Sequence, residues 1–337
     1  MIKDFLKKYD TVIFDMDGVM TSEQGYWNAA ALTVWEYLKR NKNEQINSSE
    51  CMENLKEIRK KVFCDDKLIT VLKEKGVNSN WDLAYVTVCL AWICDVDEDF
   101  SVALEYAESM PENILNYYDE LAGECSKKTG FDYEWLKRDN LMWHTVQGIF
   151  QEWYFGDKLF KKQYGYEPIN GGKSGLIFKE EPLINIEILD EILKELYESD
   201  TRLCIATGRP SSEIIPHLDR WRILKYFAKD GLCNYDYVAE GEKALGTILT
   251  KPSPYMFLKA LYGTDYSDEK IINGEYDKSK IKRTLAVGDA GADILAAQAM
   301  GADFCAVLTG VSGQKARGYF ENLKSNYILD SLADFLK

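Results

Sequence analysis

From about residue 180 onward, the sequence alternates between short strand-like runs and longer helix-like runs. RLCIATG, TLAVGD and FCAVLTG are apolar and contain β-branched residues, as buried strands do, whereas ADILAAQAM has the spacing of a helix. TVIFDMDGV, at residues 11–19, also reads as a buried strand. Such alternation predicts an α/β fold with a Rossmann-like three-layer α/β/α core around a parallel sheet.

Local signals predict where some of these elements begin. Ser211 or Ser212 is expected to cap the helix that follows RLCIATG. The helix in KPSPYMFLKALYG is expected to have Ser253 as its cap and Pro254 at its first position. The run YDYVA before it is expected to be a further strand.

The middle of the chain lacks this alternation. Segments such as WNAAALTVWEYLKR and WDLAYVTVCLAWI have helical periodicity and few strand signals. We therefore expect a core made of residues 1–24 and 180–337, with residues 25–179 inserted as an all-helical cap. The glycines of NGGKSG, residues 170–175, suit a hinge or tight turn where the chain returns. An insert that the chain enters once and leaves once, through two connecting segments, has the connectivity of a lid.

Charge and composition argue against several classes of partner. The 337 residues include 41 basic and 55 acidic side chains, a net charge of −14, which disfavours nucleic acid and anionic membranes as partners. No apolar run approaches the roughly 20 residues that span a bilayer, and the N-terminus does not resemble a signal peptide. The eight cysteines include no CxxC pair, which favours free thiols and a cytoplasmic location.

Four short motifs carry the side chains that suggest chemistry. Each is predicted to lie at the C-terminal end of a strand, which is the edge where open α/β sheets bind ligands. The motifs are Asp15-Met16-Asp17-Gly18, Thr207-Gly208, Lys251, and Gly288-Asp289 with Asp293.

This set of residue types suits phosphoryl transfer. Asp15 can attack phosphorus as a nucleophile, and Asp17 can protonate the leaving oxygen and later deprotonate water. Asp15 and Asp289 supply the hard oxygen ligands that Mg²⁺ prefers. The predicted substrate is thus a small phosphorylated molecule.

The other polar groups suit charge neutralisation. Thr207 offers a hydroxyl donor and Lys251 a positive charge to the oxygens of the transferred phosphoryl group. Asp293, one helical turn after Asp289, could orient the lysine or a metal-bound water.

A second acidic repeat serves as an internal control. Asp95, Asp97 and Asp99 imitate the start of a calcium loop, but Phe100 and Tyr106 stand where such a loop needs Gly and Glu. This repeat follows a helix-like segment, so we expect a solvated acidic loop. An Asp-x-Asp pair alone is therefore a weak signal.

The segments FDMDGVM, ATGRP, TKPSPYMF and VGDAGADILAAQAMG resemble, in order, the four motifs of the haloacid dehalogenase superfamily. The resemblance covers residues 1–24 and 180–337. It implies Asp15 as nucleophile, Asp17 as acid/base, and a phosphate site at Thr207, Gly208 and Lys251. It also implies Mg²⁺ held by Asp15, the Met16 carbonyl and Asp289, with Asp293 in support.

The resemblance also implies a subclass. An insertion just after the first motif is that of C1-capped members, which include phosphoglycolate phosphatase and β-phosphoglucomutase relatives. Asp17 disfavours transport ATPases and dehalogenases, which lack an acid/base Asp there. The cap, at about 150 residues, is roughly twice the usual size.

Three functions follow in order of preference. The first is a Mg²⁺-dependent phosphatase that hydrolyses a small phosphorylated metabolite through an aspartyl phosphate. The second is a sugar phosphomutase, and the third, of a different class, is a non-catalytic binding or regulatory protein. Three side chains of the predicted cap, Arg138, His144 and Lys158, could reach an anionic group of a substrate. The preferred interpretation is that the Arg138 and Lys158 charges are solvated on helix surfaces and that His144 occupies a core position.

Overall fold

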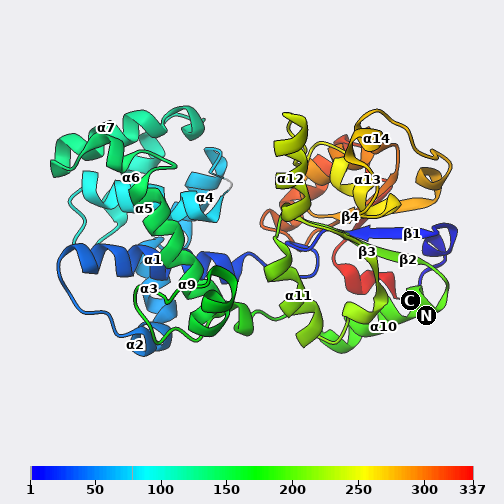
Figure 1. The fold of residues 1–337 in the computed structure, drawn as a ribbon, viewed down its shortest axis with the longest axis horizontal. Coiled ribbons are helices and arrows are strands. Elements are labelled where there is room, and N and C mark those ends of the chain that lie inside the picture. Colours follow the sequence, from blue (N-terminus) through cyan, green and yellow to red (C-terminus); the bar gives the residue numbers. More distant parts are fainter. Residues whose placement is uncertain (1, 78, 337) are drawn as a thin grey trace. The chain divides into compact units, whose positions relative to one another are not determined.

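The computed structural model describes residues 2–77 and 79–336. They form two compact units. We call Met1–Glu23 with Glu180–Lys337 the sheet unit, and Gln24–Lys179 the helical unit. Figure 1 shows both units, coloured by position in the sequence.

The sheet unit contains one six-stranded parallel sheet in the order β3-β2-β1-β4-β5-β6. Its strands are β1 (Thr11–Phe14), β2 (Arg202–Ala206), β3 (Phe227–Cys233), β4 (Thr284–Gly288), β5 (Asp303–Val307) and β6 (Tyr327–Leu329). Its helices are α10 (Ile186–Glu198), α11 (Ser211–Arg220), α12 (Tyr235–Leu245), α13 (Tyr255–Tyr262), α14 (Asp268–Ile272), α15 (Gly291–Met300) and α16 (Arg317–Asn322).

Helices cover both faces of this sheet, as Figure 1 shows for α10 on one side and α13 on the other. Because side chains alternate along a strand, β1 contributes to two cores. Val12 and Phe14 pack with α10 and α11, whereas Ile13 packs with α13 and α15. The predicted three-layer α/β/α fold with a parallel sheet is confirmed.

Three local predictions differ from the structure. YDYVA is not a strand: α12 begins at Tyr235, where the Asn234 side chain accepts a hydrogen bond from the Asp236 amide and so caps the helix. Helix α11 begins at Ser211, so the residue before it is Pro210, whose side chain cannot cap a helix. The Ser211 hydroxyl donates to Asp236.

At the start of α13, Ser253 accepts a hydrogen bond from the Tyr255 amide at 3.3 Å, as a capping side chain would. Pro254, however, is the residue before the helix and not its first residue. The predicted boundary is thus one position too early.

The described residues of the helical unit form helices and turns and contain no strand, as predicted. Its α-helices are α1 (Gln24–Asn41), α2 (Ser48–Glu53), α3 (Leu55–Val62), α4 (Lys67–Glu74), α5 (Asn80–Ile93), α6 (Ser101–Ser109), α7 (Tyr118–Thr129), α8 (Tyr133–Leu136) and α9 (Leu141–Tyr164).

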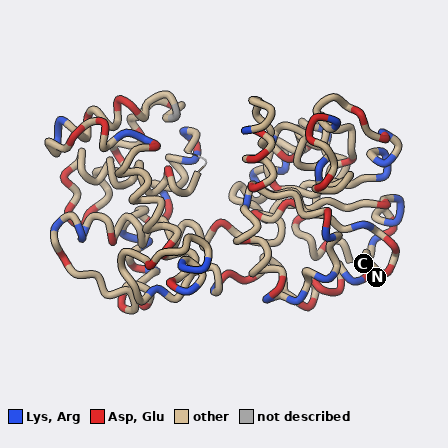
Figure 2. The backbone as a smooth tube through the Cα atoms, viewed as in Figure 1, with Lys and Arg blue, Asp and Glu red and all other residues tan. Residues whose placement is uncertain are grey.

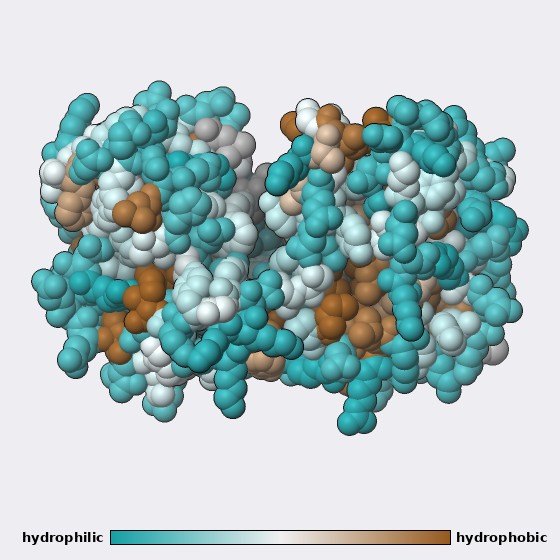
Figure 3. Space-filling model, in the orientation of Figure 1, coloured by the Kyte–Doolittle hydropathy of each residue, from teal (hydrophilic) through white to brown (hydrophobic). Residues whose placement is uncertain are grey.

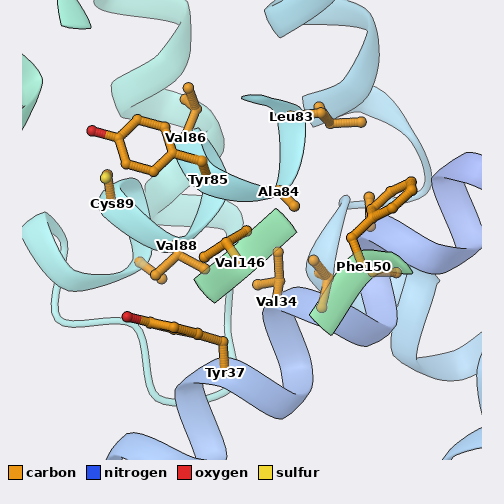
Figure 4. Close-up of a cluster of buried hydrophobic side chains, with 14 of the residues drawn as sticks. Val34, Tyr37, Leu83, Ala84, Tyr85, Val86, Val88, Cys89, Val146 and Phe150 are labelled. Atoms are coloured by element: carbon orange, nitrogen blue, oxygen red, sulfur yellow. The ribbon is translucent and has the colours of Figure 1, made fainter. Parts of the chain in front are cut away.

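Helix α5 lies at the centre of this unit and packs against α1, α7 and α9. It is apolar on all sides, which is the pattern of a fully buried helix. Figure 4 shows Val34 of α1, Tyr85 and Val88 of α5 and Val146 of α9 in the shared core. This core is separate in sequence from the two cores of the sheet.

A buried ion group holds the NGGKSG segment to two helices of this unit. The Lys173 Nζ lies 3.0 Å from Glu36 of α1 and also contacts Glu152 of α9, and all three side chains are fully buried. Asp157 accepts hydrogen bonds from the amides of Gly172 and Lys173. The segment is therefore tied down, and its positive-φ glycines make tight turns.

We expect Gly156→Ala to destabilise the helical unit by about 2 kcal/mol or more. Gly156 interrupts α9 at φ 71°, ψ 163°, a region open only to glycine, and an added Cβ would lie 2.5 Å from the Gly175 amide nitrogen. Urea denaturation measures the change. Gly148→Ala in the same helix is the control, because its Cβ meets nothing within 4 Å, and should stabilise by about 1 kcal/mol. Equal effects at both sites would contradict this account.

Acidic and basic side chains are interspersed along both units (Figure 2). The face drawn in Figure 3 is largely hydrophilic, with apolar groups among the polar ones. Among the described helices, none is long and apolar enough to cross a membrane. All eight cysteines are free thiols.

Candidate active site

Three of the predicted site residues follow three neighbouring strands. Asp15 comes directly after β1, Thr207 after β2 and Asp289 after β4, and β1 lies between the other two. Because parallel strands end at one edge of the sheet, these residues share that edge. Each of these three strands thus delivers one polar residue to the same edge of the sheet.

Lys251 reaches this edge by another route. The prediction that it ends a strand is wrong, because α12 follows β3 and the chain then returns through a turn before α13. In that turn Lys251 sits next to Pro252, and its Nζ lies 2.9 Å from Asp15 Oδ1 and 2.7 Å from Asp293 Oδ1. It also donates to the Ala206 carbonyl at 2.7 Å.

These charges interact strongly because they are nearly buried; only 3% of the Asp293 side chain and 12% of the Lys251 side chain is exposed. Burial lowers the pKa of Lys251, but Asp15 and Asp293 outweigh this effect and raise it above its ordinary value. Burial raises the pKa of Asp15, and Lys251 opposes that rise. Lys251 is therefore a permanent positive charge beside the Asp15 carboxylate.

Asp15, Asp289 and Asp293 form a group that can hold a metal ion. One carboxylate oxygen from each lies within 4.8 Å of the others. Burial raises the pKa of Asp289 well above its usual value, and Asp293 and Asp15 raise it further. Three carboxylates face one ammonium group here, so a bound divalent cation would relieve their repulsion.

The backbone around Asp289 leaves space for its carboxylate. A Cβ added at Gly18 would lie 2.2 Å from Asp289 Oδ2, and one added at Gly310 would lie 1.8 Å from it. Gly18 also has a φ of 73°, which disfavours other residues. The two glycines, far apart in sequence, form a cradle that suits a carboxylate ligand of Mg²⁺.

The structure argues against Met16 as a metal ligand. Its carbonyl oxygen accepts hydrogen bonds from the amides of Met20 and Thr21, at 2.8 Å each. These bonds direct the carbonyl into the turn that follows β1. The group that could hold a metal ion is therefore made of the carboxylates of Asp15, Asp289 and Asp293, of which Asp293 also contacts Lys251.

Adding Mg²⁺ should raise the melting temperature of the wild-type protein, and Asp289→Asn should remove this effect. The raised pKa of Asp289 means that its ionisation costs stability as pH rises from the unfolded value of about 4 toward the folded one. At pH 8 without metal, Asp289→Asn should therefore melt about 2–4 °C higher than wild type. Differential scanning calorimetry with and without Mg²⁺ measures both effects.

The matched control for this measurement is Asp97→Asn, which removes a fully exposed carboxylate. It should keep the complete Mg²⁺-induced shift. If Asp289→Asn kept that shift as well, the proposed ligand set would be wrong.

Thr207 and Gly208 lie beside the carboxylates at the end of β2. Thr207 is buried, and its hydroxyl oxygen accepts a hydrogen bond from the Arg209 amide at 3.3 Å. Gly208 is exposed, and a Cβ there would meet nothing within 4 Å. The backbone at this position is therefore open to a ligand.

The Asp17 carboxylate has side-chain partners that the sequence did not predict. Arg209 donates to its carboxylate from Nη2 at 2.6 Å and from Nε at 3.0 Å, and Thr21 donates at 3.0 Å. Arg209 also contacts Glu180, which in turn contacts His217. Sequence analysis missed these three residues, although an arginine three positions after a strand end, in ATGRP, needs a carboxylate partner if it is buried.

The three residues predicted to be near a substrate anion lie within the helical unit. Arg138 is held by Asp82, at 3.0 Å, and by Asp139, so its charge is already paired. Lys158 is exposed, as expected for a solvated charge. His144 is also exposed, so the expected core position is wrong.

The second acidic repeat, Asp95, Asp97 and Asp99, is exposed to solvent, as predicted. Asp97 and Asp99 are fully exposed, and Asp97 pairs with Lys42 while Asp95 pairs with Lys128. The acidic repeat is therefore a solvated loop.

Residues 248–335 match the protein-family model described as HAD-hydrolase-like. An X-ray structure from a structural genomics consortium is 26% identical, covers 96% of this chain and 97% of its own, and has a TM-score of 0.87. A phosphatase from Thermococcus thioreducens, at 16% identity, covers 97% of this chain and 94% of its own with a TM-score of 0.50. No curated protein matches the sequence. The chain therefore has the HAD-like hydrolase fold.

Proposed function

We propose, from this fold and the geometry of the site, that the chain is a Mg²⁺-dependent phosphatase of small phosphorylated metabolites, with Asp15 as nucleophile. The observation that carries the proposal is the buried contact of Lys251 with Asp15 and Asp293, beside Asp289. Such a cluster of buried charges suits the transfer of a phosphoryl group.

The reaction would proceed in two steps. An Asp15 oxygen forms a bond to phosphorus while the ester P–O bond breaks, and Asp17 gives its proton to the departing oxygen. Water then attacks the phosphorus of the aspartyl phosphate and loses a proton to Asp17. The bond between the Asp15 oxygen and phosphorus breaks, and inorganic phosphate leaves with the Asp15 carboxylate restored. Asp17 thus acts first as an acid and then as a base, while Asp15 is first the nucleophile and then the leaving group.

The neighbouring residues would bind and orient the phosphoryl group. Lys251 offsets negative charge on the transferring oxygens, and the Thr207 hydroxyl and the open backbone at Gly208 supply hydrogen bonds. Asp293 keeps the Lys251 ammonium in place. Mg²⁺, when bound to Asp15 and Asp289 with Asp293 in support, would neutralise further charge on the phosphate.

The helical unit is proposed to act as a cap that selects the substrate. It is inserted between the turn that carries Asp17 and Glu180, so two chain crossings join it to the sheet unit. Its size departs from that of common C1 caps, so the proposal commits to a phosphate monoester and to no named metabolite.

A panel of phosphorylated metabolites and p-nitrophenyl phosphate tests the proposal. We expect release of inorganic phosphate from at least one ester with Mg²⁺, and none after chelation by EDTA. Release that survives EDTA, or no release from any ester, would contradict it. Conversion of β-glucose 1-phosphate that depends on glucose 1,6-bisphosphate, without phosphate release, would assign a phosphomutase instead.

A further inference from the structure

A chain of buried polar side chains lies behind Asp17, and the two proposed steps do not use it. Arg209 bonds Asp17 with one side of its guanidinium group, and its Nη1 lies 3.2 Å from Glu180 Oε2. The same Glu180 oxygen lies 2.7 Å from His217 Nε2. The order is therefore Asp17, Arg209, Glu180, His217.

The contact with Asp17 restricts where its carboxylate can point. Arg209 Nη2 and Nε both donate to Asp17, and such a planar fork sets the orientation of a carboxylate as well as its distance. Thr21 holds the same Oδ1 atom from the turn. An acid/base must lie within hydrogen-bond reach of the proton that it moves, so this orientation matters for turnover.

Arg209 is in turn held from behind. Only 1% of its side chain is exposed, so its charge needs partners inside the protein. Glu180, with 4% of its side chain exposed, supplies one of them. A lysine could not replace this contact pair, because its single ammonium group cannot face Asp17 and Glu180 with a fixed planar geometry.

Helix α11 holds Glu180 at two points. His217 of α11 binds the Glu180 carboxylate, and its Nδ1 donates to the Glu213 carbonyl at 2.7 Å, which fixes the ring on the helix. Arg220 of α11 donates to the Glu180 carbonyl. Glu180 is therefore anchored although it is the first residue of the sheet unit after the helical insert.

We propose that Arg209 is a positioning residue that orients the Asp17 carboxylate, and that Glu180 is a second one that keeps Arg209 in place. The inference rests on the proposed function, since it assigns a role toward the acid/base. It links Asp17 to the residue at which the chain returns from the helical unit.

The test uses the full-length protein with Mg²⁺ and p-nitrophenyl phosphate. Arg209→Lys and Glu180→Gln are each made in the wild type and in Asp17→Asn. We expect Arg209→Lys to lower kcat by roughly 10- to 100-fold, with KM changed less than about threefold, because a misplaced catalytic group costs about that much. Glu180→Gln should lower kcat by about tenfold. In Asp17→Asn neither change should lower kcat by more than about threefold.

Arg202→Lys is the matched control, because Arg202 lies at the start of β2 and pairs with Asp230. It should leave kcat unchanged. An equal loss of kcat in both backgrounds would mean that Arg209 has a merely structural role, and a change in KM alone would place it in substrate binding. Either result overturns the inference.

A second measurement does not depend on turnover. Hydrogen exchange followed by mass spectrometry should show severalfold faster exchange of the amides of residues 16–21 in Arg209→Lys and Glu180→Gln, and no change in Arg202→Lys. Unchanged exchange in that turn overturns the inference even if the protein hydrolyses no ester. Conversely, Asp15→Asn with full activity would reject the proposed function and leave the exchange result to decide the role of Arg209.

Discussion

Asp15→Asn is expected to lower kcat for Mg²⁺-dependent ester hydrolysis by about 10⁴-fold or more, with the fold intact. An amide of the same shape cannot attack phosphorus, so no aspartyl phosphate forms. The change also removes one of the three carboxylates that lie within 4.8 Å of one another. Phosphate release measures the rate, and acid quenching with ³²P-labelled substrate measures the covalent intermediate.

The matched control for Asp15→Asn is the same substitution at an exposed aspartate, Asp97→Asn. Asp97→Asn changes the central member of the second acidic repeat, which is fully exposed and pairs with Lys42. It should leave kcat and the labelled intermediate unchanged. If Asp15→Asn retained full Mg²⁺-dependent activity, the nucleophile would be another residue and the proposed mechanism would be wrong.

Lys251→Met is expected to abolish hydrolysis and to destabilise the metal-free protein by about 3–5 kcal/mol at pH 8. Lys251 lies between Asp15 and Asp293, 2.9 Å from the first and 2.7 Å from the second. Without it, two buried carboxylates face each other unpaired. Urea denaturation gives the free energy of unfolding, and phosphate release gives the activity.

The pH dependence of this loss has a definite sign. Burial already raises the pKa of Asp15, and removal of the opposing Lys251 raises it further. A carboxyl whose folded pKa lies above its unfolded value of about 4 costs stability only where the unfolded chain is ionised. The destabilisation by Lys251→Met should therefore be largest at pH 8 and shrink as the pH falls toward 4.

Lys259→Met supplies a matched control for the loss of activity. Lys259 is also a buried lysine, and it contacts Asp268 and the Tyr266 carbonyl within the sheet unit. Its removal should lower stability while the folded protein keeps its kcat. A Lys251→Met variant that is destabilised but fully active would show that this lysine serves the fold alone.

The sequence determined those features that depend on local pattern. β-branched apolar runs followed by polar residues identified the ends of β1, β2 and β4, and therefore the edge that gathers Asp15, Thr207 and Asp289. Helical periodicity identified the inserted region, because a buried stripe repeats within a few residues whatever it packs against. The acidic repeat at residues 95–99 was distinguished from the Asp15 motif because it follows a helix-like segment and not a strand.

Only the tertiary structure decided which charges meet. Arg209 lies 192 positions from Asp17 and 29 from Glu180, and no short-range pattern encodes such pairs. Lys251 reaches Asp15 from a turn and not from a strand end, because α12 takes the chain away from β3 first. Asp15 was identified from its strand and its neighbours in sequence. The pairing of its charge with Lys251 and the groups that orient Asp17 depend on burial and distance, which the fold alone sets.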